Sequence, residues 1–377
     1  MALSIGFLST HPPTQCGLAT FNAALVSHLT TGGLSHGVVR VTTGTDDQRP
    51  GPGVVHTWSA RGIAGWRHAA VALNRFDVAI VQHEYGIYPG PDGRDVLLLL
   101  RCLEVPSIVV LHTVLTRPTT QQKALLEQIV AAAGAVVTMT GIARDRLLAG
   151  YTIDSTKVSV IPHGATKHVR TPAEARQRPH LLTWGLMGPG KGIEWALRAL
   201  AELNDLDPAP TYTVAGKTHP KVLEHHGDAY RAGLYRLGAQ LGVSTAVRYD
   251  PVYRDENSLG HLISSADVVV LPYDSREQVT SGVLIEAVAA GIPVVATRFP
   301  HAVELLTRGP GLLVPHQNPT ALAAAVRRIL TEPGLAARLA GRTRTRTPTV
   351  LWPVVAARYG ALAHELLAAW QPAAAVA

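Results

Sequence analysis

Short apolar runs rich in valine and isoleucine alternate along the chain with longer stretches whose apolar residues recur every three or four positions. In the first half the apolar runs cover residues 3–8, 38–41, 78–81, 108–111, 135–139 and 158–161, and helical spacing covers residues 18–29, 121–132 and 143–149. Uninterrupted apolar strands separated by helices are typical of a parallel sheet that is covered on both faces. The pattern therefore predicts one doubly wound domain over residues 1–165.

The same alternation returns in the second half, with strands predicted at residues 181–184, 212–215, 246–249, 268–271, 294–296 and 312–314 and helices at 193–203, 230–241, 259–264, 283–290 and 321–329. Residues 166–179 interrupt it with two prolines, several basic residues and no apolar period, which is typical of a linker. We therefore predict an α/β protein with two Rossmann-like doubly wound domains that face each other across a cleft. The second domain covers residues 180–350, and a C-terminal helix at 353–372 is expected to pack back on the first.

The composition of the 377 residues, 47% hydrophobic and 16% charged, excludes disorder as the main state. The two cysteines, Cys16 and Cys102, are too few for a disulfide framework and favour a reducing compartment. No apolar run approaches the roughly twenty residues of a membrane span, and the first residues lack a basic leader. We therefore expect a cytoplasmic protein.

The formal net charge of +7 favours anionic partners without identifying one. Aromatic residues make up 5% of the chain and do not alternate with basic ones as they do in single-strand binders, so we expect no nucleic acid partner. The densest basic stretch, residues 342–346, indicates a solvated helix end, with peripheral contact to a membrane surface as the alternative.

A glycine-rich segment, Trp184-Gly-Leu-Met-Gly-Pro-Gly-Lys-Gly-Ile-Glu194, follows a predicted strand and precedes a predicted helix. Its glycines allow close approach of the backbone to a ligand, a helix N-terminus attracts phosphate, and Lys191 adds a positive charge. The spacing is neither a Walker A loop nor the dinucleotide fingerprint, which disfavours a nicotinamide dehydrogenase. From the residues alone, a phosphate-binding loop and a flexible turn with an exposed lysine both remain open.

A second polar loop, residues 273–282, lies between a predicted strand and a predicted helix. Thr280, Ser281 and Gly282 supply backbone amides at the helix N-terminus, where anions bind favourably. Glu286 is a carboxylate in an otherwise apolar helix, and it needs a partner there. Ribose hydroxyls or an arginine would serve, and a capped helix with a surface glutamate is the alternative.

These segments together resemble glycosyltransferase family 4, the retaining GT-B enzymes that use nucleotide sugars. The similarity consists of the Gly185-to-Lys191 loop, His163-Gly164, Ala266-Asp267, and Glu286-Ala followed by Gly-Ile-Pro-Val-Val-Ala-Thr297. It implies a GT-B fold and the transfer of a hexose, with retention, from a UDP- or GDP-linked sugar. The acceptor would be a sugar, a lipid or a small molecule, and no metal or other cofactor is implied.

Carried over by position, the resemblance implies that Lys191 holds the donor diphosphate and acts in catalysis together with His112, a strand-end histidine near the transferred sugar. Glu286 would bind the ribose. The implied donor-binding residues are Gly17, Gly185, Lys191, Gln278, Thr280, Ser281, Gly282, Val283, Leu284 and Glu286, and the acceptor-side candidates are His11, Gln15, His83 and Glu84. Gln278 and Leu186 stand where the family usually has Glu and Arg, and this resembles a branch with Gln-Val-Thr-Ser-Gly in the loop.

Two other functions stay open at the level of sequence. A sugar-nucleotide epimerase or hydrolase would share the fold, and Gln278 and Leu186 also fit a catalytically silent sugar-nucleotide-binding protein. We predict no metal site, because no Cys/His cluster has zinc spacing and Asp205-Leu-Asp207 lies in a proline-rich turn.

Overall fold

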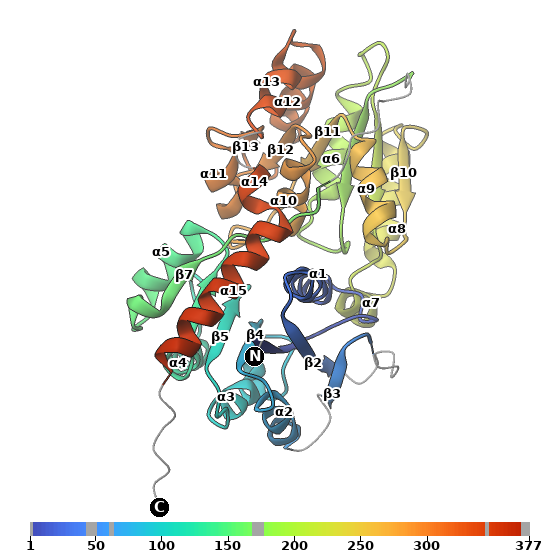
Figure 1. Cartoon of the computed structure of the whole chain (residues 1–377). Coiled ribbons are helices and arrows are strands. Elements are labelled where there is room, and N and C mark those ends of the chain that lie inside the picture. Colours follow the sequence, from blue (N-terminus) through green and yellow to red (C-terminus); the bar gives the residue numbers. More distant parts are fainter. Residues whose placement is uncertain (1–2, 43–50, 60–63, 168–176, 344–346, 371–377) are drawn as a thin grey trace, which may run out of the picture. The chain divides into compact units, whose positions relative to one another are not determined.

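The computed structural model describes residues 3–42, 51–59, 64–167, 177–343 and 347–370, which form two compact units (Figure 1). Unit 1 takes the chain up to Gly164 and again from Trp352, and unit 2 runs from Ala165 to Leu351. Most of the predicted linker, residues 168–176, lies outside the described residues, as do residues 371–372 of the predicted C-terminal helix.

Unit 1 contains a seven-stranded parallel sheet in the order β3-β2-β1-β4-β5-β6-β7. Its strands are β1 (Ser4–Ser9), β2 (Ser35–Thr42), β3 (Val54–Ser59), β4 (Val78–His83), β5 (Ser107–Leu111), β6 (Ala135–Thr138) and β7 (Val158–Val160). Its principal helices are α1 (Gly17–Thr31), α2 (Gly65–Leu73), α3 (Asp95–Leu100), α4 (Thr120–Ala132), α5 (Gly141–Gly150) and α15 (Trp352–Ala369). The central strands are buried along their whole length, as the apolar runs predicted.

Unit 2 contains a six-stranded parallel sheet in the order β10-β9-β8-β11-β12-β13. Its strands are β8 (His180–Trp184), β9 (Thr211–Ala215), β10 (Val247–Asp250), β11 (Val268–Leu271), β12 (Val294–Thr297) and β13 (Gly311–Val314). The helices are α6 (Ile193–Ala201), α7 (Pro220–His226), α8 (Ala229–Gln240), α9 (Glu256–Ser264), α10 (Gly282–Ala289), α11 (Pro300–Leu306), α12 (Pro319–Thr331), α13 (Leu335–Gly341) and α14 (Thr347–Val350). The predicted pair of doubly wound parallel-sheet domains is confirmed.

The strand order of each sheet reverses direction at one point, between β1 and β4 in unit 1 and between β8 and β11 in unit 2. At such a point the loops that leave the carboxyl ends of two adjacent strands run to opposite faces and leave a crevice in which ligands bind. In unit 2 these are the Gly185–Gly192 loop after β8 and the 272–281 loop after β11. The topology thus brings together two segments that are nearly ninety residues apart in sequence.

Helix α15 belongs to unit 1, although the whole of unit 2 precedes it in the chain (Figure 1). The buried Trp352 ring contacts Phe21 of α1 at a centroid distance of 5.2 Å and His163 at 5.8 Å. Gly164 lies so close to this ring that a Cβ at the position would be 2.2 Å from it. The indole thus fills the space between α1 and residues 163–164, after which the chain leaves unit 1 for unit 2.

We predict that Trp352→Ala lowers the free energy of unfolding by about 3–5 kcal/mol, because it leaves a large cavity beside α1. Val354 is 44% exposed on the same helix, and Val354→Ala should change stability by less than about 0.5 kcal/mol. Urea unfolding of both variants measures the difference. Equal, small effects would contradict the packing of α15 in unit 1.

Candidate functional site

The glycine-rich loop of unit 2 is folded tightly against the end of β11. Gly185, Gly190 and Gly192 have φ of +123°, +87° and +65°, a region that residues with a side chain rarely adopt. A Cβ on Gly192 would lie 1.9 Å from the carbonyl oxygen of Pro272. The glycines are therefore required by both the backbone conformation and the close contact between loops.

Hydrogen bonds fasten this loop to the loop after β11. The backbone amide of Asp274 donates to the Gly190 carbonyl at 2.9 Å, and Trp195 Nε1 donates to the Asp274 carboxylate at 2.9 Å. Trp195 lies in the first turn of α6, so one aspartate holds both the loop and the start of its helix. No motif in the sequence indicated either residue.

The side chain of Lys191 is half-buried, with Nζ 4.4 Å from the centre of the Tyr273 ring. Burial lowers the pKa of Lys191 to about 8. Within the described part of the chain no carboxylate lies within ion-pair distance of this ammonium, which is in contact with the negative face of an aromatic ring instead. Near neutral pH the site therefore presents a positive charge that an anionic ligand can neutralise.

Tyr273 is itself held from several sides. Its buried ring stacks on Phe299 with centroids 5.2 Å apart, and its carbonyl accepts hydrogen bonds from Thr297 Oγ1 at 2.6 Å and His316 Nδ1 at 2.8 Å. Burial raises the pKa of the Tyr273 phenol, and the neighbouring Ser281 hydroxyl opposes the rise. Tyr273 thus adjoins Lys191 on one side and the start of α10 on the other.

The N-terminus of α10 supplies the second half of the site. Ser281 caps the helix by accepting the Leu284 amide at 3.3 Å, and its own amide donates to Nδ1 of His301 at 2.8 Å. Two of the predicted phosphate-binding amides, those of Ser281 and Leu284, are thus already engaged. The amides of Gly282 and Val283 have no acceptor among the residues that the structure describes. These two are available to an anion at a helix N-terminus.

The two halves of the site lie side by side. Val283 Cγ2 is 3.7 Å from the position that a Cβ on Gly185 would occupy, and Tyr273 contacts Lys191 and adjoins Ser281. A Cβ on Gly190 would meet no atom within 4 Å, so that part of the loop borders open space. An ammonium and a helix tip thus share one edge of the sheet, with room beside them.

Three further residues that the sequence predicted to bind the sugar donor belong to the same region. Both carboxylate oxygens of the half-buried Glu286 lie 3.4 Å from the Thr166 amide, which donates to them. Gln278 Nε2 donates to the Thr280 carbonyl at 3.1 Å, so this side chain forms a hydrogen bond within its own loop. The Thr280 hydroxyl is buried and has no partner among the described residues.

A further basic segment lies next to the glycine-rich loop, after β9. His219 caps α7, and burial together with the charges of Lys221 and Lys191 lowers its pKa. Its amide donates to the Met187 carbonyl at 2.8 Å. The field around Lys191 is therefore positive on this side as well.

In unit 1 the candidate residues gather at the carboxyl ends of β1, β4 and β5, which are neighbours in the sheet. Gly17 is the first residue of α1 and borders open space, and Cys16 caps that helix by accepting the Ala19 amide at 3.4 Å. The buried His11 Nδ1 accepts a hydrogen bond from Asn22 Nδ2 at 3.1 Å. Burial, more than the nearby Arg40, lowers the pKa of His11 to about 4, so the ring is neutral.

His112 follows β5 and is half-buried, with its ring edge-on to Phe21 at 5.0 Å. Its Nε2 lies 2.8 Å from Oε1 of Gln82, a fully buried residue that the sequence did not indicate. Burial, followed by the nearby His163 and His83, lowers the pKa of His112 to about 3. The imidazole is therefore uncharged near neutral pH, with its proton on Nε2 and Nδ1 left as an acceptor.

The remaining acceptor-side candidates differ in accessibility. His83 is 1% exposed, its pKa is lowered to about 4 by burial, and neither ring nitrogen has a hydrogen-bond partner among the described residues. Glu84 is half-buried and accepts hydrogen bonds from Thr113 Oγ1 at 2.5 Å and from the Tyr85 amide at 3.0 Å. Gln15 is exposed. In this conformation a ligand can reach Glu84 and Gln15, whereas His83 and His11 are covered.

Other features of the described residues lie outside this site. No three His, Cys, Asp or Glu side chains there come together in a way that could hold a metal ion, and Asp205 forms a bidentate ion pair with Arg327 at 2.9 and 2.7 Å. No described helix is both long and apolar enough to cross a membrane. Of the basic stretch 342–346, residues 344–346 lie outside the described residues.

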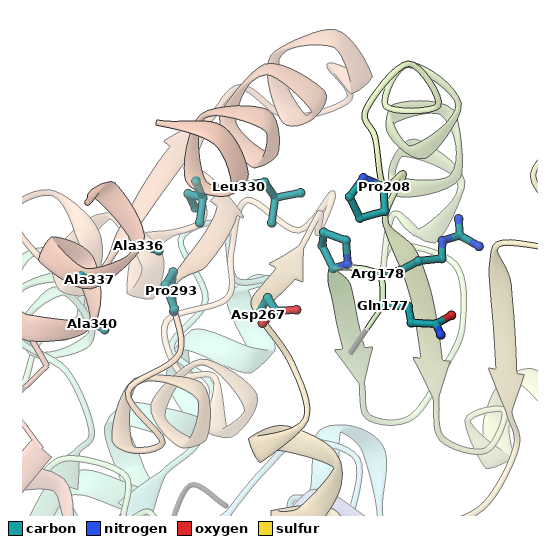
Figure 2. Close-up of a pocket in the computed structure, with 11 residues that line it drawn as sticks. Gln177, Arg178, Pro208, Asp267, Pro293, Leu330, Ala336, Ala337 and Ala340 are labelled. Carbon is teal, nitrogen blue, oxygen red and sulfur yellow. The ribbon is translucent and has the colours of Figure 1, made fainter. Parts of the chain in front are cut away.

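A cavity of about 610 Å³ opens at the amino ends of β8, β11 and β12, at the edge of the sheet opposite Lys191 (Figure 2). Pro179, Asp267 and Pro293, which precede these three strands, line it together with alanines of α13. Because ligands of parallel sheets bind at the carboxyl ends, this cavity is distinct from the candidate site.

Comparison with known proteins agrees with the geometry of unit 2. A family described as glycosyl transferases group 1 matches residues 178–332. The D-inositol 3-phosphate glycosyltransferase of Frankia alni is 30% identical over 290 residues, which cover 70% of this chain and 69% of that enzyme. The chain belongs to the group 1 glycosyltransferases. The resemblance predicted from the sequence is confirmed at this level.

A second curated relative is matched over less of its length. The enzyme of the same name from Streptomyces bingchenggensis is 31% identical over 245 residues, which cover 61% of this chain and 52% of the relative, so this match spans about half of that relative's length. Sucrose-phosphate synthase from Thermosynechococcus elongatus has a similar fold, with a TM-score of 0.77 at 21% identity over 98% of this chain and 100% of that one. HepE from Anabaena, crystallised with UDP-glucose, has a TM-score of 0.74 at 15% identity over 96% and 100%. These neighbours confirm the GT-B fold.

We predict that Lys191 loses its proton near pH 8 in the free protein, whereas exposed lysines do so above pH 10. The folded state disfavours the charged form, so the ammonium is present below pH 8 and is lost as the pH rises through that value. NMR titration of ¹³C-labelled lysine, with Lys191→Arg to assign the signal, measures this. A titration above pH 10 would contradict the burial of the amine.

Proposed function

We propose that the protein transfers a hexose, with retention of anomeric configuration, from a UDP- or GDP-linked sugar to an acceptor hydroxyl. The observation that carries the proposal is the Lys191 ammonium, without a described carboxylate partner, beside the open Gly282 and Val283 amides at adjacent strand ends. A nucleoside diphosphate carries the negative charge that fits this arrangement. Membership of the group 1 glycosyltransferases and the UDP-glucose bound by HepE support the donor class.

The chemistry follows from where charge develops. As the bond from the anomeric carbon to the diphosphate oxygen breaks, the leaving diphosphate gains negative charge and the sugar gains cationic character. A preorganised ammonium and backbone amides stabilise that charge in a partly buried site, where such interactions are strong. The acceptor oxygen forms the new bond on the face that the diphosphate leaves, and its proton passes to a phosphate oxygen. No protein base is needed in this scheme, and no metal is assigned to it.

The other residues of unit 2 take supporting roles in the proposal. Glu286 binds the ribose hydroxyls. To do so, its carboxylate gives up the long hydrogen bond from the Thr166 amide. Gln278, which is uncharged, and Thr280 serve the donor sugar. Gly185 allows close approach of the backbone to the phosphates.

In unit 1 we assign His112 to the sugar as a neutral hydrogen-bonding group, in keeping with its lowered pKa. Gly17 is assigned to the donor phosphates, and Gln15 and Glu84 to the acceptor. The relatives named D-inositol 3-phosphate glycosyltransferases make a phosphorylated polyol the first small-molecule acceptor to test.

A thermal-shift panel of UDP- and GDP-linked sugars, with and without magnesium, tests the donor class. We expect stabilisation by one nucleotide class and no requirement for magnesium. Product analysis with and without acceptors then separates the functions. Transfer supports the proposal, epimerised or hydrolysed donor without acceptor indicates the related enzymes, and binding without turnover on any acceptor indicates a silent binding protein.

We predict that Lys191→Ala lowers kcat/KM for the donor by about 100-fold or more. The change removes the ammonium beside Tyr273, which stabilises negative charge on the leaving diphosphate in the proposed mechanism. Lys123 of unit 1 is the matched control, because it is also a half-buried lysine with Nζ near an aromatic ring, 5.1 Å from the centre of Tyr151, and Lys123→Ala should leave turnover unchanged. Initial-rate kinetics and thermal unfolding of both variants give the result. Wild-type-like turnover in a folded Lys191→Ala protein would rule out the proposed mechanism.

We predict that Glu286→Ala weakens the affinity for the nucleoside diphosphate about tenfold, through loss of hydrogen bonds to a charged group. Glu286→Gln keeps one acceptor oxygen and should lose less. Calorimetric titration with UDP and GDP measures both variants. If only the KM of the acceptor changed, the assignment of Glu286 to the ribose would be wrong.

A further inference from the structure

One buried histidine of unit 2 forms two hydrogen bonds with the loop of residues 278–281. No sequence motif indicated this histidine. His301 lies at the start of α11 and is 3% exposed. Its Nδ1 accepts the Ser281 amide at 2.8 Å, and its own backbone amide donates to the Gln278 carbonyl at 3.3 Å. One residue therefore holds both ends of the 278–281 loop.

The surroundings of His301 connect it to the rest of the site. The neighbouring Phe299 stacks on Tyr273, whose ring contacts Lys191. Thr297, at the end of β12, donates to the Tyr273 carbonyl at 2.6 Å. The connection from β12 into α11 thus supports both charged elements of the site, the ammonium through Phe299 and the helix tip through His301.

The hydrogen bond to Ser281 determines which amides stay open. Ser281 is buried, and an unpaired buried amide costs about 1–3 kcal/mol, so its amide needs an acceptor in any stable conformation. With Nδ1 of His301 in that role, Ser281 remains in the capping position and the Gly282 and Val283 amides stay unengaged. The imidazole must then carry its proton on Nε2.

We propose that His301 is a positioning residue for donor binding, which fixes the 278–281 loop and thereby the two open amides of α10. The proposal rests on the function proposed above, and it adds a residue that does not itself touch the donor. The relevant property of His301 is an acceptor at the Nδ1 position. Asparagine can place its Oδ1 near that point, whereas leucine fills the volume without an acceptor.

The first measurement needs no ligand. Amide hydrogen exchange of the free protein compares wild type with His301→Leu, His301→Asn and His180→Leu. His180 is the control, because it is a half-buried histidine whose two ring nitrogens are both hydrogen-bonded, at the opposite end of β8. We expect exchange of the Ser281 amide to rise at least tenfold in His301→Leu and to stay within about threefold of wild type in the other two.

The second measurement is calorimetric titration with UDP and with GDP, followed by donor kinetics with UDP-glucose and GDP-mannose. For the nucleotide that binds wild type, we expect His301→Leu to weaken affinity about tenfold and to lower kcat more than it raises the donor KM, because small misplacements of a site cost rate. His301→Asn should recover both within about threefold. His180→Leu should lose thermal stability without either change.

The outcomes separate this inference from the proposed function. Unchanged Ser281 exchange in His301→Leu, or unchanged nucleotide affinity and kcat in that variant, overturns the positioning role alone. Failure of His301→Asn to recover affinity in a folded protein overturns the acceptor argument. Wild-type protein that binds neither UDP nor GDP overturns the proposed function and the positioning role together, even where the loop exchanges as expected.

Discussion

The contact between the Lys191 ammonium and the Tyr273 ring is the interaction on which the candidate site depends. A half-buried cation needs compensation, and a carboxylate would supply it by neutralising the charge. An aromatic face compensates only in part, so burial lowers the pKa of Lys191 while its charge stays available near neutral pH. Phe299, Thr297 and His316 hold Tyr273 in place, so contacts within unit 2 fix the position of the ring that the ammonium touches.

The two units have the same kind of sheet but differ in the charge that they present at the carboxyl ends of their strands. In unit 2 a positive amine, the charged neighbours of His219 and a helix N-terminus gather after β8, β9 and β11. In unit 1 the groups at the equivalent ends of β1, β4 and β5 include three histidines whose pKa burial lowers to about 4 or less. In the proposed function, unit 2 accordingly binds the diphosphate, and unit 1 provides neutral groups for sugar and acceptor hydroxyls.

Local pattern indicated most of the framework. The central strands of both sheets are continuous apolar runs, and such runs are buried on both faces of a parallel sheet. The edge strand β3 was missed because it is partly exposed and its apolar residues are interrupted. Helices α2 and α3 were missed because they are short, with 9 and 6 residues. The glycines of the β8–α6 loop and Lys191 could be identified because their spacing is local to one turn.

The sequence by itself determined the fold class, the glycine-rich loop after β8, the serine-containing loop after β11 and the family resemblance. Each of these depends on residues that lie close together in the chain. Only the tertiary structure decided that Tyr273 lies under Lys191, that Asp274 joins the loop to Trp195, that His301 holds Ser281 and that Gln82 pairs with His112. These partners are separated by 20 to 82 positions, and single long-range contacts produce no periodicity. Strand order brings them together, and strand order is set by the packing of the whole sheet.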